Sequence, residues 1–219
     1  MRPDLYTITC NGKPVKARAG DWWLDKSFGR MSIASVARLG ENIVTLTVSP
    51  FTIYHELEPA YVLGDFTLKA TDHGFVIASD QPLALGAWKE QGHPFYGAGV
   101  AYRQSFRVGG PHGKYVVVLP KWLGSVATVS VNGKPAGYID APPWECDVTK
   151  QIKRGDNAIE VTVIGTLKNT LGPHHGKAAL GAAWPSAFHV GPSPGPPPGA
   201  AYSTVGYGLF ELVELRELR

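Results

Sequence analysis

The chain has 219 residues with 21 Lys and Arg, 18 Asp and Glu and 7 His, so its formal net charge is only +3. This weak field gives no reason to expect a nucleic-acid partner, and no apolar stretch approaches the roughly 18 residues of a membrane span. The two cysteines, Cys10 and Cys146, are too few for a disulfide framework, although they could form one disulfide bond. The 26 Gly and 18 Pro predict many turns between short elements.

Runs rich in β-branched residues predict five strands, whereas helical spacing is scarce. The tail, residues 209–218, fits both a helix and a strand, and we favour a closing strand because what precedes it is β. Asn11-Gly12 and Asn132-Gly133 predict hairpins, since both central positions of a type I′ turn need positive φ. The chain is therefore expected to be all-β, a sandwich or jelly roll. The predicted strands are residues 6–10, 43–48, 115–119, 127–131 and 158–163.

The sequence contains an internal repeat. ITCNGKPV (8–15) followed by GENIVTLTV (40–48) is matched by VSVNGKPA (129–136) followed by GDNAIEVTV (155–163). The alternative is that the same turn chemistry is simply used twice. If the repeat is real, the first copy begins inside a jelly roll whose earlier strands are missing or come from elsewhere, for example from a swapped dimer.

The stretch LGAWKEQGHPFYGAGVAYRQSF, residues 85–106, resembles the opening of the galactose-binding-like jelly roll of multidomain glycoside hydrolases. The β-sandwich region of large α-L-rhamnosidase-like hydrolases is the nearest resemblance, and residues 56–66 and 169–175 also resemble parts of those proteins. The resemblance implies a galactose-binding-like jelly roll (β-sandwich) at residues 83–219. Residues 1–82 are then a smaller β-rich segment that resembles the end of a preceding β-sandwich.

In the proteins that the chain resembles, catalysis takes place in a barrel domain, and the roughly 250 residues of β/α alternation that a barrel needs are absent here. The resemblance therefore implies a non-catalytic carbohydrate-binding or accessory module, whose partners are a plant-type polysaccharide or oligosaccharide and a catalytic hydrolase domain. Two alternatives remain: a purely structural bracing module, and a small β-sandwich enzyme acting on sugar chains. The resemblance suggests an extracellular or periplasmic protein, although the N-terminus lacks the apolar core of a signal peptide.

Sugar binding needs exposed aromatic faces with amide, imidazole or carboxylate groups beside them. Two groups of residues in Gly- and Pro-bounded segments fit this description, and Trp144 is a further aromatic platform. For each of them the alternative is a packing role in the core or at a sheet edge. The first group is Trp88, Gln91, His93 and Tyr96, and the second is Asn169, His174, His175 and Trp184.

Catalytic and metal-binding patterns are weak. Glu56 and Glu58, like Glu145 and Asp147, are two residues apart, so each pair would share a strand face, where a solvated surface is the expected role. His174 and His175 are adjacent, which is poor spacing for metal ligands, because successive side chains diverge. No cofactor is expected with certainty, but a structural calcium ion is common in modules of this kind. The acidic residues that could hold it are Asp140, Asp147 and Asp156.

Overall fold

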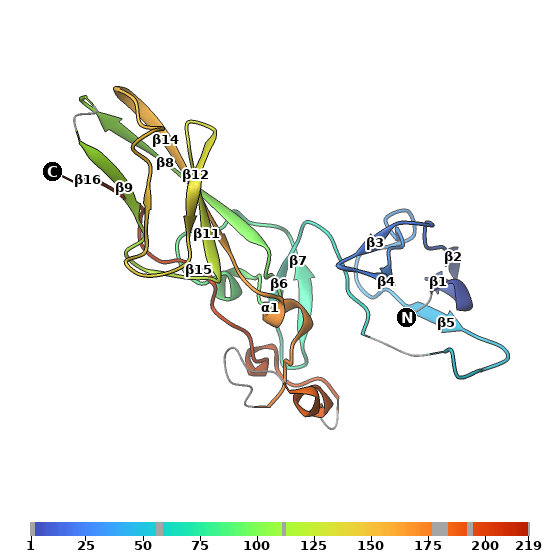
Figure 1. Ribbon diagram of the computed structural model, residues 1–219. Helices are drawn as coiled ribbons and strands as arrows, with labels where there is room; N and C mark the ends of the chain where they lie inside the picture. The colour runs from blue at the N-terminus through green and yellow to red at the C-terminus, as the bar shows by residue number, and fades with distance from the viewer. Residues whose placement is uncertain (1–2, 56–58, 111–112, 177–183, 192–194, 219) are drawn as a thin grey trace. The chain divides into compact units, whose positions relative to one another are not determined.

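The protein is described by a computed structural model, which divides into two compact units, unit 1 (Met1–Leu63) and unit 2 (Gly64–Arg219). In the described residues of both, nearly all of the regular secondary structure is β-strand (Figure 1), so the predicted all-β class is confirmed. The jelly-roll topology and the boundary between residues 82 and 83 stay predictions. The structure describes residues 3–55, 59–110, 113–176, 184–191 and 195–218.

Unit 1 contains a three-stranded antiparallel sheet in the order β2-β1-β5, and a separate ribbon of β3 and β4. The predicted hairpin is confirmed, because Asn11 and Gly12 both have positive φ, 53° and 77°. A small core of Ile8, Cys10 and Val15 lies on one face of the sheet. The elements are η1 (Pro3–Leu5), β1 (Thr7–Cys10), β2 (Lys13–Val15), β3 (Trp22–Trp23), β4 (Asp25–Gly29) and β5 (Val44–Thr47).

Unit 2 contains a four-stranded sheet in the order β12-β11-β14-β8 and a three-stranded sheet in the order β13-β9-β16. The closing strand expected in the tail is confirmed as β16. The strands are β6 (Thr67–Ala70), β7 (Phe75–Ala78), β8 (Gly99–Val108), β9 (Lys114–Val118), β10 (Trp122–Leu123), β11 (Val126–Val131), β12 (Lys134–Ile139), β13 (Glu145–Asp147), β14 (Gly155–Ile164), β15 (Gly208–Leu209) and β16 (Glu214–Leu218). The helical turns are η2 (Trp88–Gln91), α1 (Leu167–Leu171), η3 (Pro185–His189) and η4 (Gly199–Ala201).

The core of unit 2 includes alternate residues of its long strands. Val161 and Val163 on β14 and Val117 on β9 are fully buried and belong to one hydrophobic cluster. Their neighbours on β14, Glu160 and Thr162, are only partly covered, as the two-residue period of a strand requires. Both cysteines are buried and free, so neither forms a disulfide in this structure.

Two asparagines connect the β11–β12 hairpin of unit 2 to β14. Asn132 donates from Nδ2 to Asn157 Oδ1 (3.0 Å), and its own Oδ1 accepts from the Ala158 N–H (3.1 Å). Asn157 in turn accepts from the Lys153 N–H (3.0 Å) and donates to the carbonyls of Lys153 and Gly155. The side chain of Asn157 is completely buried.

The same bonds occur in unit 1. Asn11 donates from Nδ2 to Asn42 Oδ1 (2.9 Å) and accepts from the Ile43 N–H (3.0 Å). Asn42 accepts from the Arg38 N–H (2.9 Å) and donates to the carbonyls of Arg38 and Gly40. The two segments are therefore equivalent in structure bond for bond, and the sheet orders β2-β1-β5 and β12-β11-β14 match β1, β2 and β5 to β11, β12 and β14.

Candidate functional site

Trp88, the first predicted aromatic platform, lies in the core. It begins η2, is only 1% exposed and donates from Nε1 to Tyr102 Oη at 2.7 Å. The ring also lies near those of Tyr96 and Tyr207, at centroid distances of 5.9 and 6.1 Å. A ring packed on all sides presents no face to a ligand, so the structure gives Trp88 a packing role.

The other three members of the first group lie on or next to η2. The Gln91 amide is used by the loop itself, because it accepts from the Ala84 N–H (2.8 Å) and donates to two backbone carbonyls. His93 Nε2 is buried 3.9 Å from Asp80 Oδ1, which is too far for a hydrogen bond. Tyr96 is more accessible, at 39%, and its hydroxyl donates to the Gly99 carbonyl.

Asn169 and His174, of the second group, mainly hold the backbone together. The Asn169 side chain, 1% exposed, accepts from the Val205 N–H (2.7 Å) and donates to the Val205 carbonyl (2.9 Å). His174 Nε2 lies 2.8 Å from the Asn169 carbonyl, and burial lowers the pKa of this imidazole below its ordinary value. Lys168 donates to the carbonyls of Pro173 and Ser203, and burial likewise lowers its pKa.

The structure brings the segments of the two predicted groups together, because Asn169 Nδ2 donates to the Tyr96 carbonyl (3.5 Å). The rings of Phe95 and His174 are 5.0 Å apart, and the Thr170 hydroxyl donates to the Phe95 carbonyl. His175 lies against Tyr202 with a centroid distance of 5.0 Å. The result is an aromatic cluster of Phe95, His174, His175 and Tyr202, and the side chains of Asn169, Thr170 and His174 bond to backbone groups.

Trp144 and Trp184 lie outside this cluster. Trp144 is 37% exposed and meets Trp122 edge to face, with ring centroids 5.5 Å apart. Trp184 precedes η3 and is 74% exposed. Both therefore present part of an aromatic ring to solvent, in segments that the sequence placed on loops.

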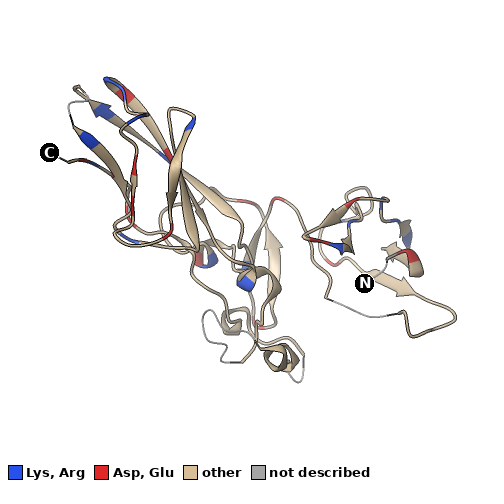
Figure 2. Ribbon diagram, viewed as in Figure 1, with Lys and Arg blue, Asp and Glu red and all other residues tan. Residues whose placement is uncertain are grey.

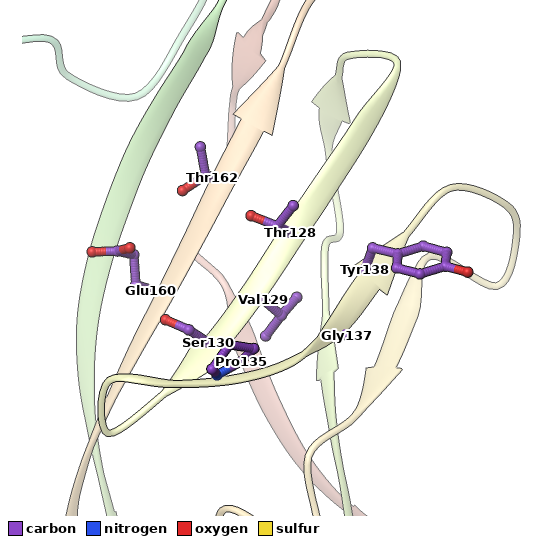
Figure 3. A pocket seen from close by; sticks show the side chains of 8 residues that line it. All are labelled: Thr128, Val129, Ser130, Pro135, Gly137, Tyr138, Glu160 and Thr162. Atoms are coloured by element: carbon purple, nitrogen blue, oxygen red, sulfur yellow. The ribbon is translucent and has the colours of Figure 1, made fainter.

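A hollow that the sequence did not single out lies on the four-stranded sheet of unit 2. Its volume is about 430 Å³ and it opens on the outer face of β11, β12 and β14 (Figure 3). Tyr138, at 66% exposure, is the aromatic side chain of the hollow, and hydroxyl groups line the strands beside it. The lining residues are Thr128, Val129, Ser130, Pro135, Gly137, Tyr138, Glu160 and Thr162.

An irregularity in β12 shapes this hollow. The pairing of β11 with β12 shifts between Val129 and Ser130, and such a bulge bends its strand and increases the local twist. Gly137 follows the shift, and a Cβ at this position would lie 2.9 Å from Cys146 Sγ. The glycine therefore lets β12 approach β13 at the edge of the hollow.

An ion pair borders the hollow. Arg103 on β8 lies opposite Glu160 on β14, with Nε to Oε2 at 2.5 Å. The arginine is 81% exposed and the glutamate 34%, so solvent screens the pair and its net contribution to stability is roughly 0–1 kcal/mol. The guanidinium keeps donors available to a ligand, because it carries five N–H groups.

The predicted carboxylate pairs offer little acid–base chemistry here. Glu145 and Asp147 are both exposed on β13, and hydrogen bonds from Thr149 lower the pKa of Asp147. Glu56 and Glu58 lie outside the described residues. Among the residues that the structure describes, no three His, Cys, Asp or Glu side chains are grouped to hold a metal ion, and no helix is long and apolar enough to cross a membrane.

No protein-family model matches the chain. Over 95 residues, 42% of its length, it is 32% identical to a protein of Formosa agariphila described as "Putative beta-glucuronidase". The chain spans only 8% of the length of that relative. The expected resemblance to part of a large glycoside hydrolase is therefore confirmed.

Solved structures of glycoside hydrolases also show similarity. A rhamnosidase from Novosphingobium sp. PP1Y is 22% identical over 80% of this chain, which covers 17% of that chain, with a TM-score of 0.43. The β-glucuronidase of Bifidobacterium dentium, complexed with coumarin-3-O-glucuronide, is 22% identical over 68% of this chain and 28% of its own, with a TM-score of 0.37.

Proposed function

We propose that this chain is a non-catalytic accessory module of a glycoside hydrolase, and that it contacts carbohydrate through the hollow on the outer face of β11, β12 and β14. The observation that carries the proposal is the exposed Tyr138 ring beside hydroxyl groups in an open hollow of about 430 Å³. The sequence similarity to a segment of a protein described as a β-glucuronidase supports the ligand class.

The hollow offers two kinds of contact to a sugar. The Tyr138 ring can lie against the C–H face of a pyranose, which is a hydrophobic contact with a defined geometry. Thr128, Ser130 and Thr162 can each donate or accept a hydrogen bond, and they line the same hollow. Binding would order few rotatable groups, because the residues that carry these hydroxyls lie on paired strands. Single-site binding is expected to be weak, and tethering to a catalytic domain would raise it through effective concentration.

The exposed Trp184 offers the competing location, because it belongs to the group that the sequence predicted. It is more accessible than Tyr138, but it precedes a short helical turn and is not among the residues of the hollow. The two locations can therefore be separated by single substitutions.

The test is affinity electrophoresis of the folded, monodisperse chain with glucuronic-acid-containing, rhamnose-containing and neutral polysaccharides. We expect retardation by at least one of them, weakened about ten-fold by Tyr138→Ala, as the loss of one stacked ring predicts. Trp184→Ala is the matched control and is expected to bind like the unchanged chain. Loss in Trp184→Ala alone would overturn the hollow as the contact. No retardation by any glycan would overturn carbohydrate binding and favour the bracing role, and turnover of a chromogenic glycoside would overturn the non-catalytic assignment.

A further inference from the structure

Strand β5 of unit 1 has an open edge. The sheet order β2-β1-β5 leaves it paired on one side only, by β1, in the part of the chain that the structure describes. Its Val44 and Leu46 side chains are 51% and 36% exposed, and the strand carries no charged residue (Figure 2). Natural edge strands usually carry charges, bulges or a covering segment that prevents pairing, and β5 has none of these among the described residues.

The repeat shows what covers the equivalent strand of unit 2. Since Asn42 corresponds to Asn157, Val44 corresponds to Ile159 and Leu46 to Val161. Ile159 and Val161 are 1% and 0% exposed. Strand β8 pairs antiparallel with β14 along its whole length, and β8 turns alternate side chains toward the core. Those side chains that pack on the core cluster are Val100, Tyr102, Phe106 and Val108.

The backbone of β5 is oriented for such a pairing. The Ile43 carbonyl accepts from the Asn11 N–H, and the Ile43 N–H donates to Asn11 Oδ1, so both backbone groups of Ile43 point toward β1. Successive residues of a strand direct these groups to alternate sides. The N–H and C=O groups of Val44 and Leu46 therefore point to the open edge.

Unit 1 has little core of its own. Within the described residues its buried apolar side chains are Ile8, Cys10 and Val15. Large apolar side chains of the same unit lie in solvent, which is unusual for a finished domain surface. Those more than 40% exposed are Trp22, Leu24, Leu39, Ile43, Val44, Phe51, Ile53, Tyr54, Val62 and Leu63.

We propose that the open edge of β5 receives an antiparallel strand from a polypeptide segment outside these 219 residues, which completes unit 1 as β8 completes the four-stranded sheet of unit 2. The added strand would carry apolar side chains at alternate positions, facing the side of the sheet on which Cys10, Val44 and Leu46 lie. A second copy of this chain is the poorer donor, because β8, the strand with this pattern, is already paired with β14. The inference concerns unit 1 and is independent of the hollow in unit 2.

The experiment is amide hydrogen exchange of the full chain, followed by NMR, with a synthetic peptide of the β8 sequence, residues 99–108, as the probe. In the free chain the Val44 and Leu46 amides should exchange about 100-fold faster than those of Ile159 and Val161, since unpaired edge amides open without unfolding. The peptide should slow them about ten-fold, as added strand pairing protects them. A peptide of the same composition in which the apolar residues are grouped together, so that they no longer alternate with polar ones, should not.

Two variants separate strand addition from a general effect of the peptide. Leu46→Lys places a charge on the apolar face and should abolish the slowing. Thr45→Lys places it on the opposite face of the same strand and should preserve it. Three results would overturn the proposal: slow exchange of both amides in the free monomer, concentration-dependent dimerisation that protects them, or equal effects of the two peptides.

Discussion

The two copies of the repeat place one set of hydrogen bonds in different surroundings. Asn42 and Asn157 accept and donate the same bonds, yet Asn42 is exposed whereas Asn157 is completely buried. The strands that follow differ in the same way, because β14 is covered by β8 and β5 has an open edge. The turn residues thus determine how the strands are connected. The distant strand that covers the sheet determines how much these hydrogen bonds contribute to stability.

The largest expected difference between the units concerns tryptophan. Trp88→Ala removes a ring that is 1% exposed and should lower the free energy of unfolding of unit 2 by about 4 kcal/mol, through lost burial and the cavity left behind. Trp22, 46% exposed in unit 1, is the control, and Trp22→Ala should cost less than about 1 kcal/mol there. Hydrogen exchange followed by mass spectrometry measures the stability of each unit separately. A tolerated Trp88→Ala would refute the packing role assigned to this residue.

The asparagine pair should give the next largest effect. Asn157→Ala removes the completely buried side chain that pairs with backbone groups of Lys153 and Gly155, and should destabilise unit 2 by about 3 kcal/mol. Asn42→Ala removes the same bonds where water can replace them, and should destabilise unit 1 by about 1 kcal/mol. The exchange rates of the slowest amides in β14 and in β1 measure the loss of stability in unit 2 and in unit 1. Equal effects would mean that burial does not govern the strength of this network.

A smaller contrast is expected at the strands themselves. Val161→Ala deletes two methyl groups from a site with 0% exposure and should cost unit 2 about 2 kcal/mol. Leu46→Ala, at the corresponding position of β5, should change the stability of unit 1 by no more than about 0.5 kcal/mol. Local exchange of β14 and β5 is again the measurement. If Leu46→Ala costs as much as Val161→Ala, then β5 is already covered in solution.

Much of the strand pattern could be predicted from the sequence, because it depends on neighbouring residues. The Asn-Gly hairpins, the repeat and the closing strand β16 follow from turn residues and two-residue alternation. The burial of Trp88 could not be predicted in this way. Its glycine neighbour indicates a loop, but whether that loop packs inward depends on Tyr102 and Tyr207, which are distant in the sequence.

The hollow was missed for a related reason. The alternation of residues along β12 does not reveal the register shift between Val129 and Ser130, because the bulge depends on how β12 pairs with β11. One signal was available: Tyr138 directly precedes the buried Ile139, so strand alternation places its ring on the outer face. The predicted loop residues Asn169 and His174 are indeed close together, but their polar atoms bond to backbone, which sequence alone does not show.

The smallest expected effect is the pH dependence of unit 2 that His174 introduces. Burial lowers the pKa of His174 in the folded state, so the unfolded chain binds more protons than the folded one between that lowered pKa and the ordinary value of 6.5. Stability should therefore be constant above this window and fall as the pH drops through it. His174→Gln keeps a donor for the Asn169 carbonyl and should flatten the dependence of the urea midpoint measured from pH 7 to pH 5. His189→Gln, which changes an exposed histidine of the same unit, should leave the dependence unaltered, and a flattened profile in this variant would assign the titration to another group.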